Sequence, residues 1–345
     1  MKKIFILLVI TTGLITSCKN FDIEFPDFDY STGYFPYQYP VRTIILGNYI
    51  YDNSNDNNHK FVISTAMGGI YENKKDVTFS FVVDGSLCED AFFSNMDTIR
   101  LLPSNYYQLS SPDKIVIKKG DVNGGVEVQL TDAFFNDPLS LVRTYVLPLR
   151  LTGVTGVDSL LQGSPAIAGA DRRIAGNWTI SPKDFTMFAV KFVNPYHGSY
   201  LHYGSCEVRN EAGATVGQNT YSTTYVEQNE IWSLSTVSIA GVSLTGSFKS
   251  TLEGSFQMRL NFASDDFMAS GGVNCTIVQA PGSPYTISGT GRYAVDAEEY
   301  GGKKRDAIYL TYTINNDAYT YTATDVLVFR DKGINLETYT PTIKH

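Results

Sequence analysis

The sequence predicts an all-β protein made of two domains. The chain has 345 residues, which at roughly 100 to 200 residues per domain corresponds to about two domains. Its 23 Tyr, 20 Phe and 29 Gly favour half-buried pleated surfaces and turns over helices. From residue 41 onward, short runs of alternating apolar and polar residues are separated by clusters of Gly, Asn, Asp and Pro. This is the period-2 pattern of strands joined by turns.

The first seventeen residues have the form of a signal peptide. Two lysines precede an apolar stretch at 4–16, which is too short to span about 30 Å of hydrocarbon. Residues 14–18, Leu-Ile-Thr-Ser-Cys, resemble the lipobox of bacterial lipoproteins, in which the cysteine is lipidated and becomes residue one. The resemblance implies a lipid anchor at Cys18; the alternative is an ordinary secretory signal that ends by chance in a cysteine.

The residues after Cys18 bear on where the anchored protein is located. Four acidic residues follow the cysteine and resemble the export signal that sends Bacteroidetes-type lipoproteins to the outer leaflet: Asp22, Glu24, Asp27 and Asp29. We therefore expect a protein anchored in the outer membrane and facing the cell exterior. Residues 18–39 are expected to form the lipidated cysteine and its tether.

Residues 40–160 are predicted to form an immunoglobulin-like β-sandwich. Alternating runs occur at 76–83, 114–118, 125–130 and 145–151. In the last run Tyr145, Leu147, Leu149 and Leu151 fall on one face, while Pro148 suggests an edge strand.

A shift in composition suggests the domain boundary. Residues 152–175 are poor in aromatic residues and rich in Gly, Ala and Ser, so we place the boundary at 161–183 and expect Trp178 to pack between the domains. Residues 184–345 then form a C-terminal antiparallel meander. Such a meander either closes into an up-and-down, lipocalin-like barrel or folds over as a sandwich.

Charge and cysteine content restrict the possible partners. The formal net charge is -8 and no long basic run occurs, which argues against nucleic-acid binding. Besides the lipidated Cys18, the mature chain contains Cys88, Cys206 and Cys275, so Cys206 and Cys275 could form one disulfide, or all three could be free. No spacing indicates a metal site or a cofactor.

Several stretches together resemble a known family. They lie at 73–84, 101–110, 130–135 and 145–150, and at 184–198, 199–204 and 326–330. The first four resemble the N-terminal domain of unknown function of Bacteroidetes surface lipoproteins from polysaccharide-utilisation systems, which is also found ahead of chitinase-like endoglycosidases. The last three resemble its companion C-terminal domain. The resemblance implies a glycan-binding accessory of a SusC/SusD-like outer-membrane importer, with no catalytic residues to carry over.

The sequence contains no motif of a known catalytic site. Glycosidases need two carboxylates facing one cleft, but the adjacent acid pairs of this chain would point to opposite faces if they lay on strands. HExxH, G-x-S-x-G and Walker sequences are also missing from the sequence. We therefore expect a protein that is not an enzyme.

Four residues are candidates for glycan contact. Trp232 lies beside an acid and an amide, a mixture that offers a sugar an apolar face and hydrogen bonds. Tyr196, His197 and Tyr203 gather at the start of the second domain, where stacking on a sugar is conceivable. Packing in the core is the alternative for all of them. Two other functions stay open: a structural or adhesive lipoprotein that binds proteins, and a barrel that holds a small apolar ligand.

Overall fold

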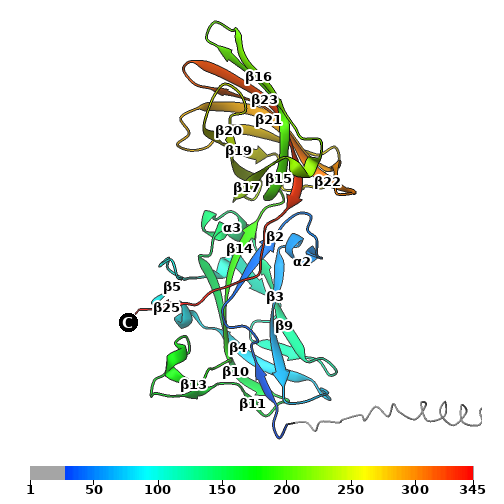
Figure 1. Cartoon of the computed structure of the whole chain (residues 1–345). Coiled ribbons are helices and arrows are strands. Elements are labelled where there is room, and N and C mark those ends of the chain that lie inside the picture. Colours follow the sequence, from blue (N-terminus) through cyan, green and yellow to red (C-terminus); the bar gives the residue numbers. More distant parts are fainter. Residues whose placement is uncertain (1–27, 345) are drawn as a thin grey trace, which may run out of the picture.

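The computed structural model describes residues 28–344 and shows an all-β protein of two units, a sandwich and a barrel (Figure 1). The predicted fold class is thereby confirmed. The predicted signal peptide and Cys18 lie outside the described residues.

The N-terminal unit consists of two facing sheets. In spatial order, the first sheet contains β11 (Ser159–Leu160), β1 (Thr32–Tyr34), β3 (Lys60–Gly68), β9 (Asn123–Leu130) and β7 (Tyr107–Leu109). The second contains β24 (Glu337–Thr338), β2 (Pro40–Ile45), β14 (Phe185–Val193), β10 (Tyr145–Thr155), β4 (Val77–Val83) and β8 (Lys114–Ile117), with β6 (Arg100–Leu101) beside β10. Because β1 belongs to the first sheet, the folded unit begins within the stretch that was expected to be tether.

Short elements complete this unit. Two small sheets pair β12 (Ser164–Pro165) with β13 (Trp178–Ile180), and β5 (Ala91–Phe92) with β25 (Thr342–Ile343). The helical turns are α2 (Ser54–Asn57), α3 (Asp132–Phe135), η1 (Gly85–Cys88), η2 (Ser104–Tyr106), η3 (Pro138–Leu141), η4 (Ala175–Asn177) and, in the barrel, η5 (Val226–Gln228).

Alternate residues of the two sheets fill the sandwich core. Phe61 of β3, Phe79 of β4 and Leu149 of β10 belong to one buried cluster between the sheets. Each such side chain contributes about 1.5 to 3 kcal/mol when it leaves water. The opposite face of the second sheet is also covered, since Val146 and Met187 pack under the segment that carries η1 and β5. This two-sided burial explains why β14 and the first seven residues of β10 are buried at nearly every position.

The expectation that Pro148 marks an edge strand is wrong, because β10 lies between β14 and β4. The Pro148 carbonyl accepts a hydrogen bond from Asp84 N, directly after β4 ends at Val83. Pro148 has no backbone N–H, and the missing donor faces the position just beyond the end of β4. No carbonyl of β4 needs a hydrogen bond from β10 there, so the proline is tolerated inside the sheet.

The C-terminal unit is a closed antiparallel barrel of eight strands. The strands are β15 (Gly198–Asn210), β17 (Glu230–Ser238), β18 (Gly241–Ser247), β19 (Ser255–Phe262), β20 (Val273–Gln279), β21 (Thr286–Tyr300), β22 (Lys303–Asn315) and β23 (Tyr319–Asp331). The barrel closes where β23 pairs with β15, and β16 (Thr215–Tyr221) extends the wall beside the second half of β15. Of the two arrangements left open by the sequence, the meander adopts the barrel.

Large side chains fill the barrel interior. Tyr200, Trp232, Tyr312 and Tyr321 belong to its buried cluster. Gly289 of β21 makes room for one of them, because a Cβ at this position would lie 2.6 Å from the Cα and Cβ of Tyr312. An eight-stranded barrel can be filled by side chains or can hold one small ligand. In this barrel the buried aromatic and aliphatic side chains form a packed core.

The boundary between the units lies later than the composition suggested. Phe185–Val193, expected to open the second domain, is β14 and pairs with β10 and β2 of the sandwich. The chain enters the barrel after Asn194 and returns after Lys332, and β24 and β25 then pair with the sandwich strands β2 and β5. Two chain crossings therefore join the units.

Trp178 does not join the units as expected. It lies on β13 at the side of the sandwich, away from the barrel (Figure 1), and its Nε1 donates to the carbonyl of Asp171 at 2.7 Å. The Gly- and Ala-rich segment forms an irregular excursion of the sandwich. Its composition indicated a loss of regular structure rather than a domain boundary.

The three cysteines in the described range are buried free thiols, so Cys206 and Cys275 are not bonded to each other. Within residues 28–344, no helix is both long enough and apolar enough to cross a membrane.

Candidate functional site

Two of the four predicted contact residues are inaccessible. Trp232 is 3% exposed, and Tyr196 is fully buried and stacks on Phe262 with ring centroids 3.6 Å apart. The Tyr196 hydroxyl donates to the carbonyl of Ser264 at 2.6 Å. Their faces are covered by the protein, which corrects the expectation that these rings lie open to a ligand.

Trp232 belongs to a polar network inside the barrel. Its ring stacks on His202 at 3.6 Å, and its Nε1 donates to Glu230 Oε2 at 3.1 Å. His202 Nε2 lies 3.2 Å from the carboxylate of buried Asp325, but the two groups are not aligned for a hydrogen bond. The hydroxyl of Tyr312 donates to this carboxylate at 2.7 Å, and the hydroxyl of Tyr221 also donates to it. These partners make burial of the carboxylate tolerable.

The other two predicted residues lie on different surfaces. His197 is half-buried at the first crossing and its Nδ1 accepts from Thr236 N at 3.2 Å. Burial, together with the positive charges of Lys332 and Lys191, lowers the pKa of His197 to about 4. Tyr203 is half-exposed on the outside of β15. The structure therefore does not bring the four predicted residues together.

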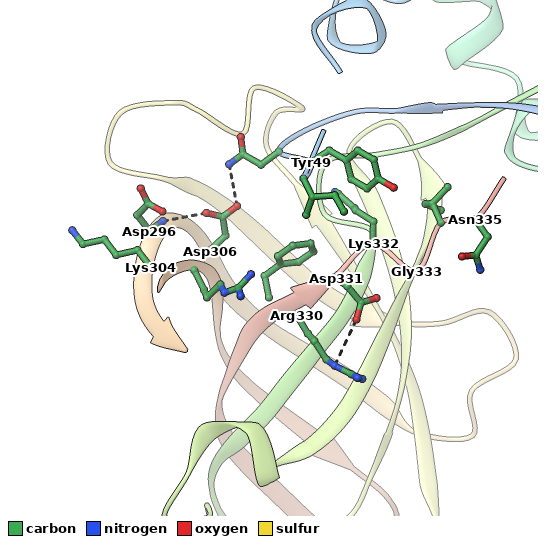
Figure 2. Close-up of a pocket in the computed structure, with 14 residues that line it drawn as sticks. Tyr49, Asp296, Lys304, Asp306, Arg330, Asp331, Lys332, Gly333 and Asn335 are labelled. Atoms are coloured by element: carbon green, nitrogen blue, oxygen red, sulfur yellow. Dashed lines mark hydrogen bonds and ion pairs between the residues drawn. The ribbon is translucent and has the colours of Figure 1, made fainter. Parts of the chain in front are cut away.

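A pocket of about 430 Å³ lies where the two units meet (Figure 2). The sandwich contributes the loop after β2, and the barrel contributes the hairpin between β21 and β22 and the end of β23. Its lining consists of Asn48, Tyr49, Ile50, Asp296, Lys304, Arg305, Asp306, Phe329, Arg330, Asp331, Lys332, Gly333, Ile334 and Asn335. A pocket of this size, with apolar surface and a few converging polar groups, has the usual character of a small-ligand site.

Two buried charged groups form the floor of the pocket. Asp306 accepts hydrogen bonds from Tyr293 at 2.5 Å, from Asn48 at 3.2 Å and from the backbone of Asp296 at 3.1 Å. Lys332 donates to the carbonyl of Pro195 at 2.5 Å and lies 3.4 Å from that of Asn194. Burial lowers the pKa of Lys332 to about 7, while the charge of Asp306 opposes this shift.

These floor contacts also connect the two units. Asn48 of the sandwich reaches Asp306 of the barrel, and Lys332 at the second crossing binds the backbone of the first. Gly47 has φ +86° and passes so close to Pro195 that a Cβ would lie 2.7 Å from its Cα. A glycine is therefore required where the loop approaches the first crossing.

The rim of the pocket offers groups that the fold does not use. Tyr49 is half-exposed and its ring packs edge-on against Tyr51 at 5.8 Å, while Ile50 is 79% exposed. The side chains of Lys304 and Asn335 are exposed and form no hydrogen bond or ion pair with any described residue. An aromatic face beside amide and charged side chains is suited to a ligand that carries many hydroxyl groups.

No sequence motif indicated this pocket, because its residues come from three segments, 48–50, 296–306 and 329–335, and the first lies about 250 positions before the other two. Among the described residues, no group of three or more His, Cys, Asp or Glu side chains could hold a metal ion.

Comparisons with known proteins agree with the two units. A family model for a domain of unknown function, DUF5627, matches residues 195–333, and a model described as an N-terminal domain matches residues 28–158. No curated protein matches the chain.

Solved structures of similar proteins come from Bacteroides. A crystal structure of a Bacteroides ovatus protein of unknown function is 39% identical, with a TM-score of 0.84, over 92% of this chain and 100% of that chain. A Bacteroides ovatus multidomain protein that includes DUF1735 is 12% identical, with a TM-score of 0.40, over 89% and 99% of the two chains. An auxiliary nutrient binding protein from Bacteroides thetaiotaomicron is 12% identical, with a TM-score of 0.37, over 84% and 90%. The DUF5627 model thus covers the barrel, and the chain belongs to the same family as the 39% identical Bacteroides ovatus protein, a family of two-unit β proteins.

Proposed function

We propose that this protein is a non-enzymatic, glycan-binding surface lipoprotein whose ligand occupies the pocket between the sandwich and the barrel. The observation that carries the proposal is the rim of that pocket, where Tyr49, Lys304 and Asn335 offer a ring, a cation and an amide that the fold leaves available. A sugar presents an apolar ring face and a surrounding set of hydroxyl groups, which such side chains can bind.

The floor of the pocket supports binding rather than catalysis. A general acid or base needs a polar atom that can reach the substrate. The Asp306 carboxylate is held by three donors, and the amine of Lys332 is directed to backbone carbonyls. Both groups therefore maintain the shape of the pocket, and we infer that the bound sugar is released unchanged to an importer of the SusC/SusD type.

The arrangement of the units suits a protein anchored at its N-terminus. β11, which pairs with the first described strand β1, lies at the end of the sandwich opposite the barrel (Figure 1). An anchor at Cys18 would therefore attach to the end of the molecule that is far from the pocket. The pocket and the barrel would then extend away from the outer membrane toward ligands outside the cell.

Replacing Cys18 should release the protein from the membrane. Without the thiol no acyl chain can be attached, so we expect Cys18→Ala to be absent from the outer-membrane fraction and to incorporate no labelled palmitate. Cell fractionation and labelling measure both properties, with Cys88→Ala as the control that keeps the anchor. An acylated, membrane-bound Cys18→Ala protein would contradict the lipoprotein proposal.

Removing the rim aromatic should weaken sugar binding. A glycan array with the soluble chain from Lys19 would identify an oligosaccharide, and calorimetric titration would then measure its affinity. We expect Tyr49→Ala to bind this oligosaccharide about two- to tenfold more weakly, because ring contacts contribute about 0.5 to 1.5 kcal/mol. Tyr30→Ala, which removes an exposed ring elsewhere on the sandwich, should bind like the wild type.

Three outcomes of these measurements would contradict the proposed function. An array without any bound glycan would leave the pocket without its proposed ligand. An affinity unchanged in Tyr49→Ala would place the sugar elsewhere, and release of reducing sugars from the bound oligosaccharide would show catalysis.

A further inference from the structure

The outer wall of the barrel carries a row of side chains that the pocket does not use. In the strand register, Tyr203 of β15 lies beside Val326 of β23, which lies beside Tyr309 of β22, followed by Arg292 of β21. All four are at least partly exposed, while the residues on either side of Val326, Asp325 and Leu327, are buried. The row therefore faces outward from the barrel.

One carboxylate holds both tyrosine rings of this row. The Tyr309 hydroxyl donates to Glu298 Oε1 at 2.8 Å, and the Tyr203 hydroxyl lies near enough to the same carboxylate for its charge to raise the pKa of Tyr203. Burial and the nearby Glu298 together raise the pKa of Tyr203 and of Tyr309 to about 12, so both hydroxyls remain donors at neutral pH. The rings are thus fixed before any ligand arrives, which reduces the entropy lost on binding.

A shallow groove of about 760 Å³ is lined by Val326, Tyr309 and Arg292 of this row and continues over β20 and the end of β19. Tyr203 adjoins the groove at Val326, its partner in the strand register. Apart from Ala263 and Arg292, the exposed side chains along it are amides and hydroxyls: Asn261, Asn274, Thr276, Thr290, Thr311 and Thr324. Arg292 is the one exposed charged side chain in the lining of this groove, because Asp325 points into the barrel. The chemistry of the groove therefore favours an uncharged ligand with many hydroxyl groups, and the net charge of -8 disfavours a polyanion.

We propose that this outer groove is a second glycan site, which binds an extended, uncharged polysaccharide chain across strands β15, β23, β22 and β21. The two tyrosines are separated by one strand, so the backbones that carry them stand about 9.5 Å apart. Two fixed rings at this separation contact two sugar units of the same chain. The groove lies on the outer face of the barrel wall and so accepts an internal segment of a polymer.

The test is affinity electrophoresis of the soluble chain in native gels that contain one polysaccharide each. Galactomannan, xyloglucan, arabinoxylan and pectic galactan are the uncharged probes, and polygalacturonate is the charged one. We expect retardation by at least one uncharged polysaccharide. Tyr203→Ala and Tyr309→Ala should each weaken that retardation about two- to tenfold.

Four further variants test whether the two fixed rings themselves bind the polymer. Tyr309→Phe keeps the ring and should retain most of the affinity, and Tyr225→Ala, an exposed tyrosine outside both sites, should have no effect. Glu298→Ala frees both rings and should weaken retardation, whereas Glu298→Gln keeps an acceptor and should restore it. Far-UV circular dichroism checks that each variant is folded.

The outcomes distinguish the groove from the pocket. Retardation that Tyr49→Ala leaves intact and the Tyr203→Ala, Tyr309→Ala double variant removes supports the second site. Retardation that the double variant leaves unchanged overturns it, as does retardation by polygalacturonate alone. A protein that binds an oligosaccharide in the pocket but is retarded by none of the polysaccharides keeps the proposed function and loses the second site.

Discussion

Trp232→Ala is expected to lower the free energy of unfolding by about 3 to 5 kcal/mol, the range for a buried tryptophan truncated to alanine. The ring is 3% exposed within the barrel core and stacks on His202. Its loss leaves a cavity beside that buried histidine and removes a hydrogen bond to Glu230. Urea denaturation followed by circular dichroism measures the change.

The second tryptophan provides the control for this experiment. Trp178 is partly exposed on β13 at the side of the sandwich, so Trp178→Ala should change the free energy of unfolding by about 1 kcal/mol or less. Equal effects of the two substitutions would show that Trp232 is not a core residue. A Trp232→Ala protein of wild-type stability that no longer binds sugar would instead restore it as a ligand contact.

The stability of the protein relative to Lys332→Met should rise as the pH increases from about 7 toward 10. Burial lowers the pKa of Lys332 from 10.5 to about 7 in the folded protein. Between these values the unfolded chain binds a proton that the folded chain does not, so the free energy of unfolding increases with pH. The wild type should gain about 2 to 3 kcal/mol over Lys332→Met between pH ~7.5 and ~9.5.

The matched control for Lys332 comes from the same pocket. Lys304 is exposed, so Lys304→Met should change the free energy of unfolding by about 0.5 kcal/mol or less. Urea denaturation at several pH values gives the three curves. Parallel curves for the wild type and Lys332→Met would mean that this lysine stays protonated in the fold and that the pocket floor carries a full positive charge.

The strands could be predicted from the sequence because their signals are local. Period-2 alternation and turn-forming residues identified the strands at 76–83, 114–118 and 125–130 close to where the structure has them. The same reasoning could not assign residues 185–193 to a unit, because the alternation of a strand does not reveal its partner. Pairing with β2, nearly 150 residues earlier in the chain, places β14 in the sandwich.

The binding-site residues could not be predicted in the same way. Whether a side chain is exposed depends on how distant strands pair, and neighbouring residues do not reveal that pairing. Ile231 and Trp232 are adjacent and both apolar, yet Ile231 is 47% exposed and Trp232 is 3% exposed. Which of the two points inward is decided when β23 closes the barrel against β15.

The sequence by itself determined that the chain is all-β, where its turns lie and that no long basic run is present, since these properties depend on neighbouring residues. Only the tertiary structure decided which tyrosines stay at the surface and that Tyr49, Asp306 and Lys332 share one pocket. Barrel closure and the two chain crossings bring these residues together from positions far apart in the sequence, and such long-range pairings leave no local pattern to read.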